Sequence, residues 1–271
     1  MQQPFDYLDK TVFIAGGTSG INLGIAHCFA QAGAKLGVLS RSPEKVQAAV
    51  AALKSHGGEV AGFSADVRDY AAVETALKQA QQQLGNFDVL VSGAAGNFPA
   101  PALGLSANGF KSVIDIDLNG SFHVLRAAFP LLNKPGATVI NISAPQSFIP
   151  MEFQMHVCAA KAGVDMITRV AAMEWGAAGV RVNSIVPGPI DDTEGMRRLA
   201  PTEQARKLTL NSVPLGRLGS ASEIGQACLW LASPYAAYVT GAVIPVDGGW
   251  SLGGVAAMSA GMKTLFNDTK N

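Results

Sequence analysis

The feature that most constrains this chain is a glycine-rich turn close to its start, where residues 11–26 read TVFIAGGTSGINLGIA. An apolar run enters the glycines and apolar residues at helical spacing follow, which predicts a strand, a tight turn and a helix. Glycines let the backbone approach a pyrophosphate closely, and the N-terminus of the following helix binds its charge. We therefore predict a cofactor loop over residues 15–24, although an ordinary glycine-rich loop is the alternative. Its predicted phosphate-binding residues are Gly16, Thr18, Ser19, Gly20 and Ile21.

Strand and helix patterns alternate through the rest of the chain. Further strands are expected at residues 35–40, 59–65, 88–92, 138–143, 181–186 and 242–246, and helices at 43–55, 69–84, 107–132, 155–177 and 222–232. This alternation predicts an α/β fold, namely a single-domain Rossmann-type doubly wound parallel sheet of about seven strands with helices on both faces. Ligands then bind beyond the carboxyl ends of the strands.

The composition fits one globular domain over residues 1–271. Hydrophobic residues make up 48% of the chain and charged residues 15%, and the formal net charge is +0. A neutral chain lacks the basic footprint of a nucleic-acid binder, so no nucleic-acid partner is expected. No repeat, linker or low-complexity segment indicates a second domain.

The cysteines and the chain ends bear on location. Cys28, Cys158 and Cys228 fall in helical patterns without metal-ligand spacing, which predicts buried thiols in a reducing compartment and no metal site. The polar start MQQPFDYLDK does not resemble a signal peptide, and no apolar run is long enough to span a membrane. The final residues NDTKN carry no peroxisomal tripeptide. We expect a cytoplasmic protein with no membrane partner.

The end of the second strand indicates which dinucleotide binds. Ser40, Arg41 and Ser42 stand where an NAD-preferring fold places a carboxylate for the ribose hydroxyls. An arginine there suits the 2′-phosphate of NADP, so NADP(H) is the predicted cofactor, with Ser40 and Arg41 among its ligands. The alternative is a solvated surface arginine.

The glycine turn also resembles that of a known family. Gly16-x-x-x-Gly20-Ile21 is similar to the TGxxxGxG motif of the short-chain dehydrogenase/reductase family, with Ala15 in place of the threonine and Asn22 in place of the last glycine. The resemblance implies that Asp66 and Val67 contact adenine, whereas from sequence alone they could cap the next helix. It also implies that Ile190 and Thr193 contact the nicotinamide carboxamide. The further cofactor contacts that it implies are, in full, Ala94, Lys161, Pro187, Gly188, Ile190 and Thr193.

The family's catalytic pattern is present only in part. Carbonyl-reducing members use a serine, Tyr-x-x-x-Lys and an asparagine; the resemblance places Ser143 at the serine and Lys161 at the lysine that holds the nicotinamide ribose. Val157 stands where the tyrosine is expected. Valine has no proton to give, so the family's usual carbonyl reduction is not available. Ser143 could bind substrate or water, or merely cap its strand.

The sequence around Val157 and several other stretches resemble one group of enzymes within this family more closely. The stretches AAGNF, DID, HVCAAKAGVD, EWG and PGPI are similar to the peroxisomal type of 2,4-dienoyl-CoA reductase. That resemblance implies NADPH-dependent hydride transfer to an enoyl or dienoyl thioester, with coenzyme A as the expected carrier. It also implies that Asp117 supplies a proton through water. In the mitochondrial type of the enzyme an asparagine that matches Asn119 binds the thioester oxygen, and we expect Asn119 to do so here. The alternatives are a reductase of another carbonyl or alkene and a catalytically decayed NADP(H)-binding protein.

Helix geometry limits how these two residues cooperate. Residues two apart on a regular helix face nearly opposite directions, so Asp117 and Asn119 share a pocket only if the helix is distorted. Asp117 falls on an apolar stripe, where burial favours a protonated acid. The alternatives are a buried, paired structural acid for Asp117 and a helix-bridging amide for Asn119. His156 is expected to be a satisfied surface or interface histidine.

Two further expectations concern the lid and the assembly. The charge-rich insertion at approximately 190–215 is expected to form a substrate lid. Small residues in the helices at 107–132 and 155–177 permit close helix packing, and members of the resembled family pair these helices. A homotetramer is therefore expected.

Overall fold

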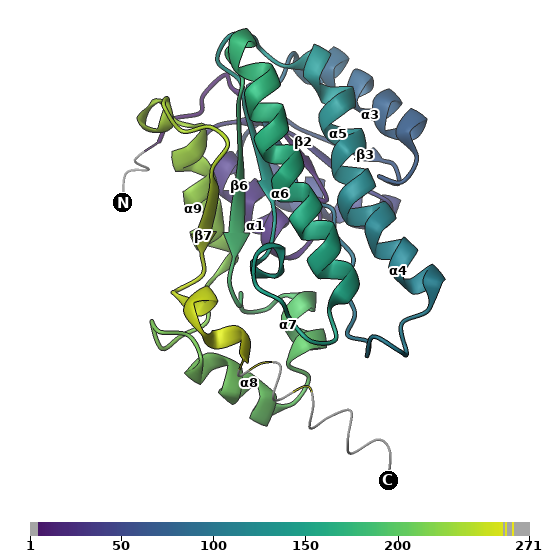
Figure 1. Cartoon of the computed structure of the whole chain (residues 1–271). Helices are drawn as coiled ribbons and strands as arrows, with labels where there is room; N and C mark the ends of the chain where they lie inside the picture. The colour runs from purple at the N-terminus through teal and green to yellow at the C-terminus, as the bar shows by residue number, and fades with distance from the viewer. Residues whose placement is uncertain (1–4, 257, 259–261, 263–271) are drawn as a thin grey trace.

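The computed structural model describes residues 5–256, 258 and 262 (Figure 1). The final residues NDTKN, which were expected to carry no peroxisomal signal, lie outside the described residues. Seven parallel strands form one sheet in the order β3-β2-β1-β4-β5-β6-β7, so the predicted fold class is confirmed. Their bounds are β1 Thr11–Ala15, β2 Lys35–Ser40, β3 Val60–Ser64, β4 Val89–Ser92, β5 Thr138–Ile142, β6 Arg181–Pro187 and β7 Val243–Val246.

Helices cover both faces of the sheet, because the strands are apolar on both sides. Val12 and Ile14 of β1 face one core and Phe13 and Ala15 face the other, as the two-residue period of a strand requires. The helices are α1 Gly20–Gln31, α2 Pro43–Lys54, α3 Tyr70–Leu84, α4 Ala107–Val113, α5 Gly120–Ala128, α6 Met155–Trp175, α7 Glu194–Leu199, α8 Glu203–Asn211 and α9 Ala221–Ala232.

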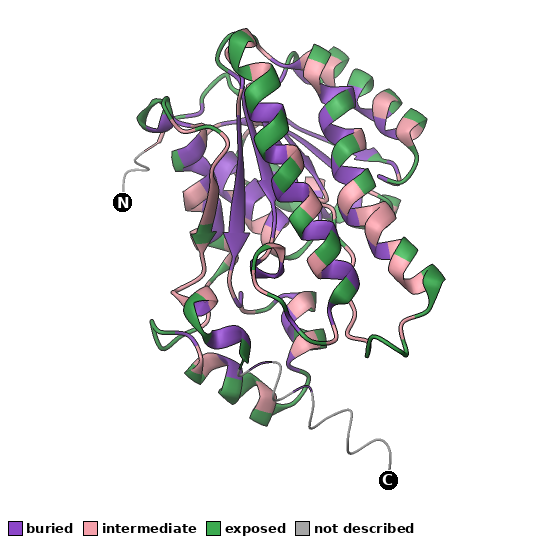
Figure 2. Cartoon of the chain, viewed as in Figure 1, coloured by how far each residue is buried: buried purple, intermediate pink, exposed green. Residues whose placement is uncertain are grey.

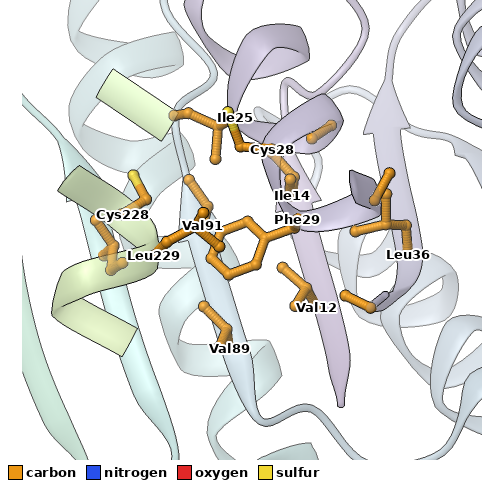
Figure 3. Packing of buried hydrophobic residues seen from close by; sticks show 14 of the residues in the cluster. Val12, Ile14, Ile25, Cys28, Phe29, Leu36, Val89, Val91, Cys228 and Leu229 are labelled. Carbon is orange, nitrogen blue, oxygen red and sulfur yellow. The ribbon is translucent and has the colours of Figure 1, made fainter. Parts of the chain in front are cut away.

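The first core lies between the sheet and helices α1 and α9. Ile25, Cys28 and Phe29 of α1 meet Cys228 and Leu229 of α9 over Val12, Ile14, Val89 and Val91 (Figure 3). The second core packs α3, α5 and α6 on the opposite face. Figure 2 shows purple strands in the interior and green outer faces on the helices. Of the three thiols, Cys28 and Cys228 are buried as predicted, whereas Cys158 is only partly buried.

The helix predicted over residues 107–132 is not continuous. α4 and α5 are joined by a π-helical turn, Ile114–Asn119, and a 3₁₀ turn, Phe129–Leu131, follows α5. The π-helical turn packs closely against α6. A Cβ on Gly163 of α6 would lie 2.7 Å from Cδ1 of Leu118 in that turn. No described helix is both long and apolar enough to cross a bilayer.

Candidate active site

A cavity of about 550 Å³ opens at the carboxyl ends of the strands. Its walls come from the β1–α1 turn, the ends of β2 to β6, the N-terminal half of α6 and the segment around α7. All predicted site residues line it except Asn119. The sheet therefore brings together side chains from the whole length of the chain at the edge where ligands bind in such folds.

The glycine turn forms one wall of this cavity. Gly16 and Gly20 have φ angles of +81° and +53°, a region that L side chains rarely adopt. A Cβ on Gly16 would lie 2.9 Å from Ala94 Cα, so the turn also needs glycine for space. Ser19 caps α1 without a side-chain hydrogen bond, which leaves the N–H groups of the first turn to an external acceptor. This cradle fits the pyrophosphate of a dinucleotide.

The end beside β2 and β3 is positively charged. Arg41 and Lys45 are exposed and both line the cavity. Lys45, in the first turn of α2, was missed from sequence; the signal was a second cation four residues after Arg41. Two cations without a carboxylate at the end of β2 fit a phosphorylated ribose.

Asp66 lines this end and is not the helix cap. Asp69 is the N-cap of α3, and its side chain accepts from Ala72 N at 3.1 Å. Asp66 instead accepts from Arg68 Nη2 at 2.6 Å, and hydrogen bonds from that guanidinium hold the pKa of Asp66 below its ordinary value. Both oxygens of the carboxylate are bonded to Arg68, and Asp66 lines the cavity beside Val67, the place expected for an adenine contact.

The π-helical turn directs Asp117 into the cavity wall. Its Oδ1 accepts from Gly96 N at 2.7 Å, and its Oδ2 lies 3.3 Å from Lys161 Nζ. Lys161 also donates to Ile142 O at 3.0 Å. The Asp117 residue is only 1% exposed and Lys161 6%, so the ion pair is screened little by water. A buried, paired acid was one of the alternatives, and this pair also lines the cavity.

Asn119 lies outside the cavity. It is exposed, and its Nδ2 donates to Asp115 Oδ1 at 3.1 Å, the helix-bridging contact that was its alternative. The π-helical turn widens the backbone but does not bring Asp117 and Asn119 to one face. The geometry gives no support to thioester binding by Asn119.

Val157 occupies the place of the missing tyrosine, and Ser143 and Gln146 line the same cavity. Val157 is 3% exposed and lines the cavity with an apolar surface. Ser143 follows β5, and its buried Oγ has no hydrogen-bond partner among the described residues, so it does not cap the strand. Gln146 lines the same region and donates from Nε2 to Met151 Sδ at 3.4 Å. The Ser143 hydroxyl is therefore free to donate to a ligand oxygen in the cavity.

The segment over approximately residues 190–215 borders the other side. Ile190 and Thr193 line the cavity, and Thr193 Oγ1 accepts from Met196 N at 3.2 Å as the N-cap of α7. Arg198 Nη1 donates to Asn97 O at 2.8 Å, which ties α7 to the loop after β4. Met196, Leu199, Trp250 and Met258 add apolar surface. This border suits an acyl chain.

His156 is not the satisfied surface residue that was expected. It is 0% exposed, and its ring meets Phe98 edge-on with centroids 4.5 Å apart. No hydrogen bond of ordinary geometry reaches either ring nitrogen within the described part of the chain. Burial lowers the pKa of His156, and nearby backbone groups of Gln154 and Phe98 only partly offset this. The imidazole is thus held neutral beside the cavity.

The described residues hold no group of three or more potential metal ligands. The polar groups of the cavity are suited to phosphates, ribose and a carbonyl oxygen.

Comparisons with known proteins show which proteins this chain resembles. A family model described as "Enoyl-(Acyl carrier protein) reductase" matches residues 15–251. A peroxisomal 2,4-dienoyl-CoA reductase [(3E)-enoyl-CoA-producing] of Rattus norvegicus is 44% identical over 243 residues, which are 89% of this chain and 83% of that protein. A probable 2,4-dienoyl-CoA reductase [(2E)-enoyl-CoA-producing] of Bacillus subtilis is 40% identical, covering 89% of this chain and 96% of that protein.

One solved structure that is similar to this chain contains NADPH. It is described as an NADPH-bound short-chain oxidoreductase of Pseudomonas aeruginosa PAO1 with an atypical catalytic centre. It superposes with a TM-score of 0.84 at 30% identity, over 91% of this chain and 98% of that one.

Proposed function

The chain belongs to the short-chain dehydrogenase/reductase family, and we propose that it is an NADPH-dependent 2,4-dienoyl-CoA reductase. The observation that carries the proposal is the replacement of the family's proton donor. A dinucleotide cavity has apolar Val157 at the place of the tyrosine, with the buried Lys161–Asp117 pair beside it. The sequence identity to two dienoyl-CoA reductases supports the same activity.

NADPH is the proposed cofactor. Arg41 and Lys45 would pair with the 2′-phosphate, Asp66 and Val67 would contact the adenine, and the first turn of α1 would hold the pyrophosphate. Lys161 would bind the nicotinamide ribose, with Ala94, Pro187, Gly188, Ile190 and Thr193 around the nicotinamide half. The bound cofactor supplies a hydride to the far end of the conjugated thioester.

The protein's part is to stabilise the charge that follows. Addition at the far carbon delivers negative charge to the thioester oxygen, and a donor pointing at that oxygen lowers the barrier. Ser143 Oγ is buried beside the cavity without a partner, which suits it to this bond. Asn119, exposed and bonded to Asp115, is not given this role.

A proton must then reach a carbon of the dienolate. Asp117 is the proposed source, through a water molecule: the water gives its proton to the carbon, and Asp117 replaces it with the proton that it shares with Lys161 Nζ at 3.3 Å. Protonation next to the carbonyl carbon, close to Ser143, yields a 3-enoyl thioester. Protonation two carbons further yields a 2-enoyl thioester, so the product reports where the proton arrives.

A panel of substrates tests the reaction class. The purified protein and NADPH are mixed with a dienoyl-CoA, a monoenoyl-CoA and a simple ketone, and products are identified by proton NMR. We expect turnover of the dienoyl-CoA to the 3-enoyl product and no turnover of the ketone. Turnover of the ketone or of the monoenoyl-CoA would support a reductase of another substrate instead. Tight NADPH binding without any turnover would support a decayed cofactor-binding protein.

Two further parts of the proposal concern assembly and location. A homotetramer is proposed because the outer faces of α5 and α6 expose Phe122, Met166, Val170 and Met173. Cytoplasmic location remains our proposal for the chain, although relatives are named as peroxisomal. Import of a fluorescent fusion into peroxisomes would contradict it.

A further inference from the structure

The side chain of Asn22 joins the glycine turn to the end of β4. Asn22 is the third residue of α1 and is 9% exposed, and its Nδ2 donates to Gly93 O at 2.7 Å. The N–H of Gly93 donates to Ala15 O at 3.1 Å. Both backbone polar groups of Gly93 are therefore tied to the β1–α1 unit.

Gly93 is required for space and not for its backbone conformation. It is not among the described glycines with positive φ, so other residues could adopt its backbone angles. A Cβ at this position would, however, lie 2.3 Å from Asn22 Oδ1 and 2.6 Å from its Nδ2. The carboxamide of Asn22 occupies the space of the missing side chain. The two residues are thus a matched pair, each of which restricts the other.

This pair fixes a wall at the centre of the cofactor cavity. β4 lies between β1 and β5, and Gly16, Asn22, Gly93 and Ala94 all line the cavity. The backbones of the two segments touch, since a Cβ on Gly16 would be 2.9 Å from Ala94 N. A shift of residues 93–94 would change the width of the cleft between its Arg41 end and its Lys161 end.

The carboxamide oxygen of Asn22 argues against a purely stabilising role. Asn22 Oδ1 is buried and has no hydrogen-bond partner among the described residues. Buried acceptors are normally satisfied, and one that is not costs stability. A smaller residue would avoid that cost. Groups that lower stability are typical of sites where geometry serves binding.

We propose that Asn22 is a positioning residue of the cofactor site, whose carboxamide holds Gly93–Ala94 against the glycine turn at the width that a dinucleotide requires. Gly93 is its obligatory partner. The role rests on the proposed binding of NADPH, whereas the pairing itself does not.

Ligand binding tests the positioning role without any assay of turnover. Binding of NADPH is measured by nicotinamide fluorescence, and binding of 2′-AMP by calorimetry, for the parent and Asn22→Ala. Loss of one buried hydrogen bond should raise the NADPH Kd about tenfold. The Kd of 2′-AMP should stay unchanged, because this fragment lacks the pyrophosphate and needs only the Arg41 end. An unchanged NADPH Kd, or equal weakening of both ligands, would overturn the role.

A double-mutant cycle in thermal unfolding tests the pairing. Gly93→Ala should lower the Tm sharply or prevent folding in the parent, and should have little effect in the Asn22→Gly background, where space has been made. Equal effects in both backgrounds, including failure of both to fold, would refute the pairing. A parent chain that binds neither NADPH nor NADH would refute the proposed cofactor and the positioning role, while the cycle would still decide the pairing.

Discussion

Lys161 Nζ lies 3.3 Å from Asp117 Oδ2, and the two side chains are 7% and 1% exposed. Removal of one member of a buried ion pair leaves the other charged and unpaired, so each residue stabilises the other. The second Asp117 oxygen is held by Gly96 N. The acid is thereby fixed at the cavity wall by an α6 side chain on one side and a loop on the other.

Substitutions of Asp117 and Lys161 should fail differently. Asp117→Asn keeps an acceptor for Gly96 but cannot take up and pass on a proton, so turnover should fall by roughly 10² to 10⁴ with NADPH affinity nearly intact. Asp117→Ala should show the same loss. Lys161→Ala should weaken NADPH binding as well as turnover. Steady-state kinetics and NADPH titration measure both quantities. An Asp117→Asn protein that works at the parent rate would remove Asp117 from the mechanism.

Cofactor preference should depend on the two cations at the end of β2. NADPH should bind more tightly than NADH, and Arg41→Ala or Lys45→Ala should each weaken NADPH by about tenfold, the value of one charge-assisted hydrogen bond. NADH affinity should not change. Lys54→Ala, at the far end of α2, is the matched control. Equal Kd values for NADPH and NADH in the parent would defeat this prediction.

Val157→Tyr should restore the family's ordinary donor. Positions 157 and 161 lie one helical turn apart, so a phenol at 157 would face the cavity beside Lys161. We expect this variant to gain reduction of a ketone that the parent leaves untouched, as measured by NADPH consumption. Val157→Phe has a similar ring without the hydroxyl and should gain nothing. Ketone reduction by both variants would show that the hydroxyl is not the cause.

Stability should decrease on the acid side of neutrality because of His156. Its folded-state pKa is lowered by burial, so the unfolded chain binds the proton more readily. The stabilisation is present above the ordinary pKa of 6.5 and is lost as the pH falls through it towards the lower folded-state value. Urea midpoints of the parent should therefore drop between about pH 7 and pH 5.

His156→Gln should flatten this dependence. Some dependence should remain, because the pKa of His27 is also lowered, by burial and by His56. Carboxylates with lowered pKa values, such as Asp66, contribute only at still lower pH. The same midpoint shift in His156→Gln as in the parent would contradict the assignment.

The assembly should depend on the outer face of α6. Met166 and Met173 are 55% and 84% exposed, and a charge there would oppose burial against a second copy. The parent should have the mass of a tetramer in light scattering, and Met166→Glu/Met173→Glu should give a smaller species. Leu103→Glu, exposed on another segment, is the control. A monomeric parent would refute the tetramer.

The fold could be predicted because its signals are local. Apolar runs, glycine turns and helical spacing each fall within a few residues, and the strands they predicted form the observed sheet. Asp117 and Lys161 were also found, through the stretches that resemble known reductases. Their ion pair was not predictable, since it depends on how α6 packs against the π-helical turn.

Other features depend on three-dimensional contacts that no local pattern reveals. Asn119 was expected at the site, but the π-helical turn leaves it exposed against Asp115. His156 is buried, although a surface or interface position was expected. Asn22 seemed a departure from a glycine motif, and only the structure relates it to Gly93.

A single-turnover reaction of the protein with stoichiometric NADPH and a 2,4-dienoyl-CoA tests the proposed dienoyl-CoA reductase activity most directly. The absorbance bands of the nicotinamide and of the dienoyl thioester are followed together. We expect both bands to decay at the same rate and to the same molar extent, since each hydride lost by NADPH, together with one proton, converts one diene to a monoene. Decay of neither band, with NADPH demonstrably bound, would contradict the proposal that this cavity reduces dienoyl thioesters.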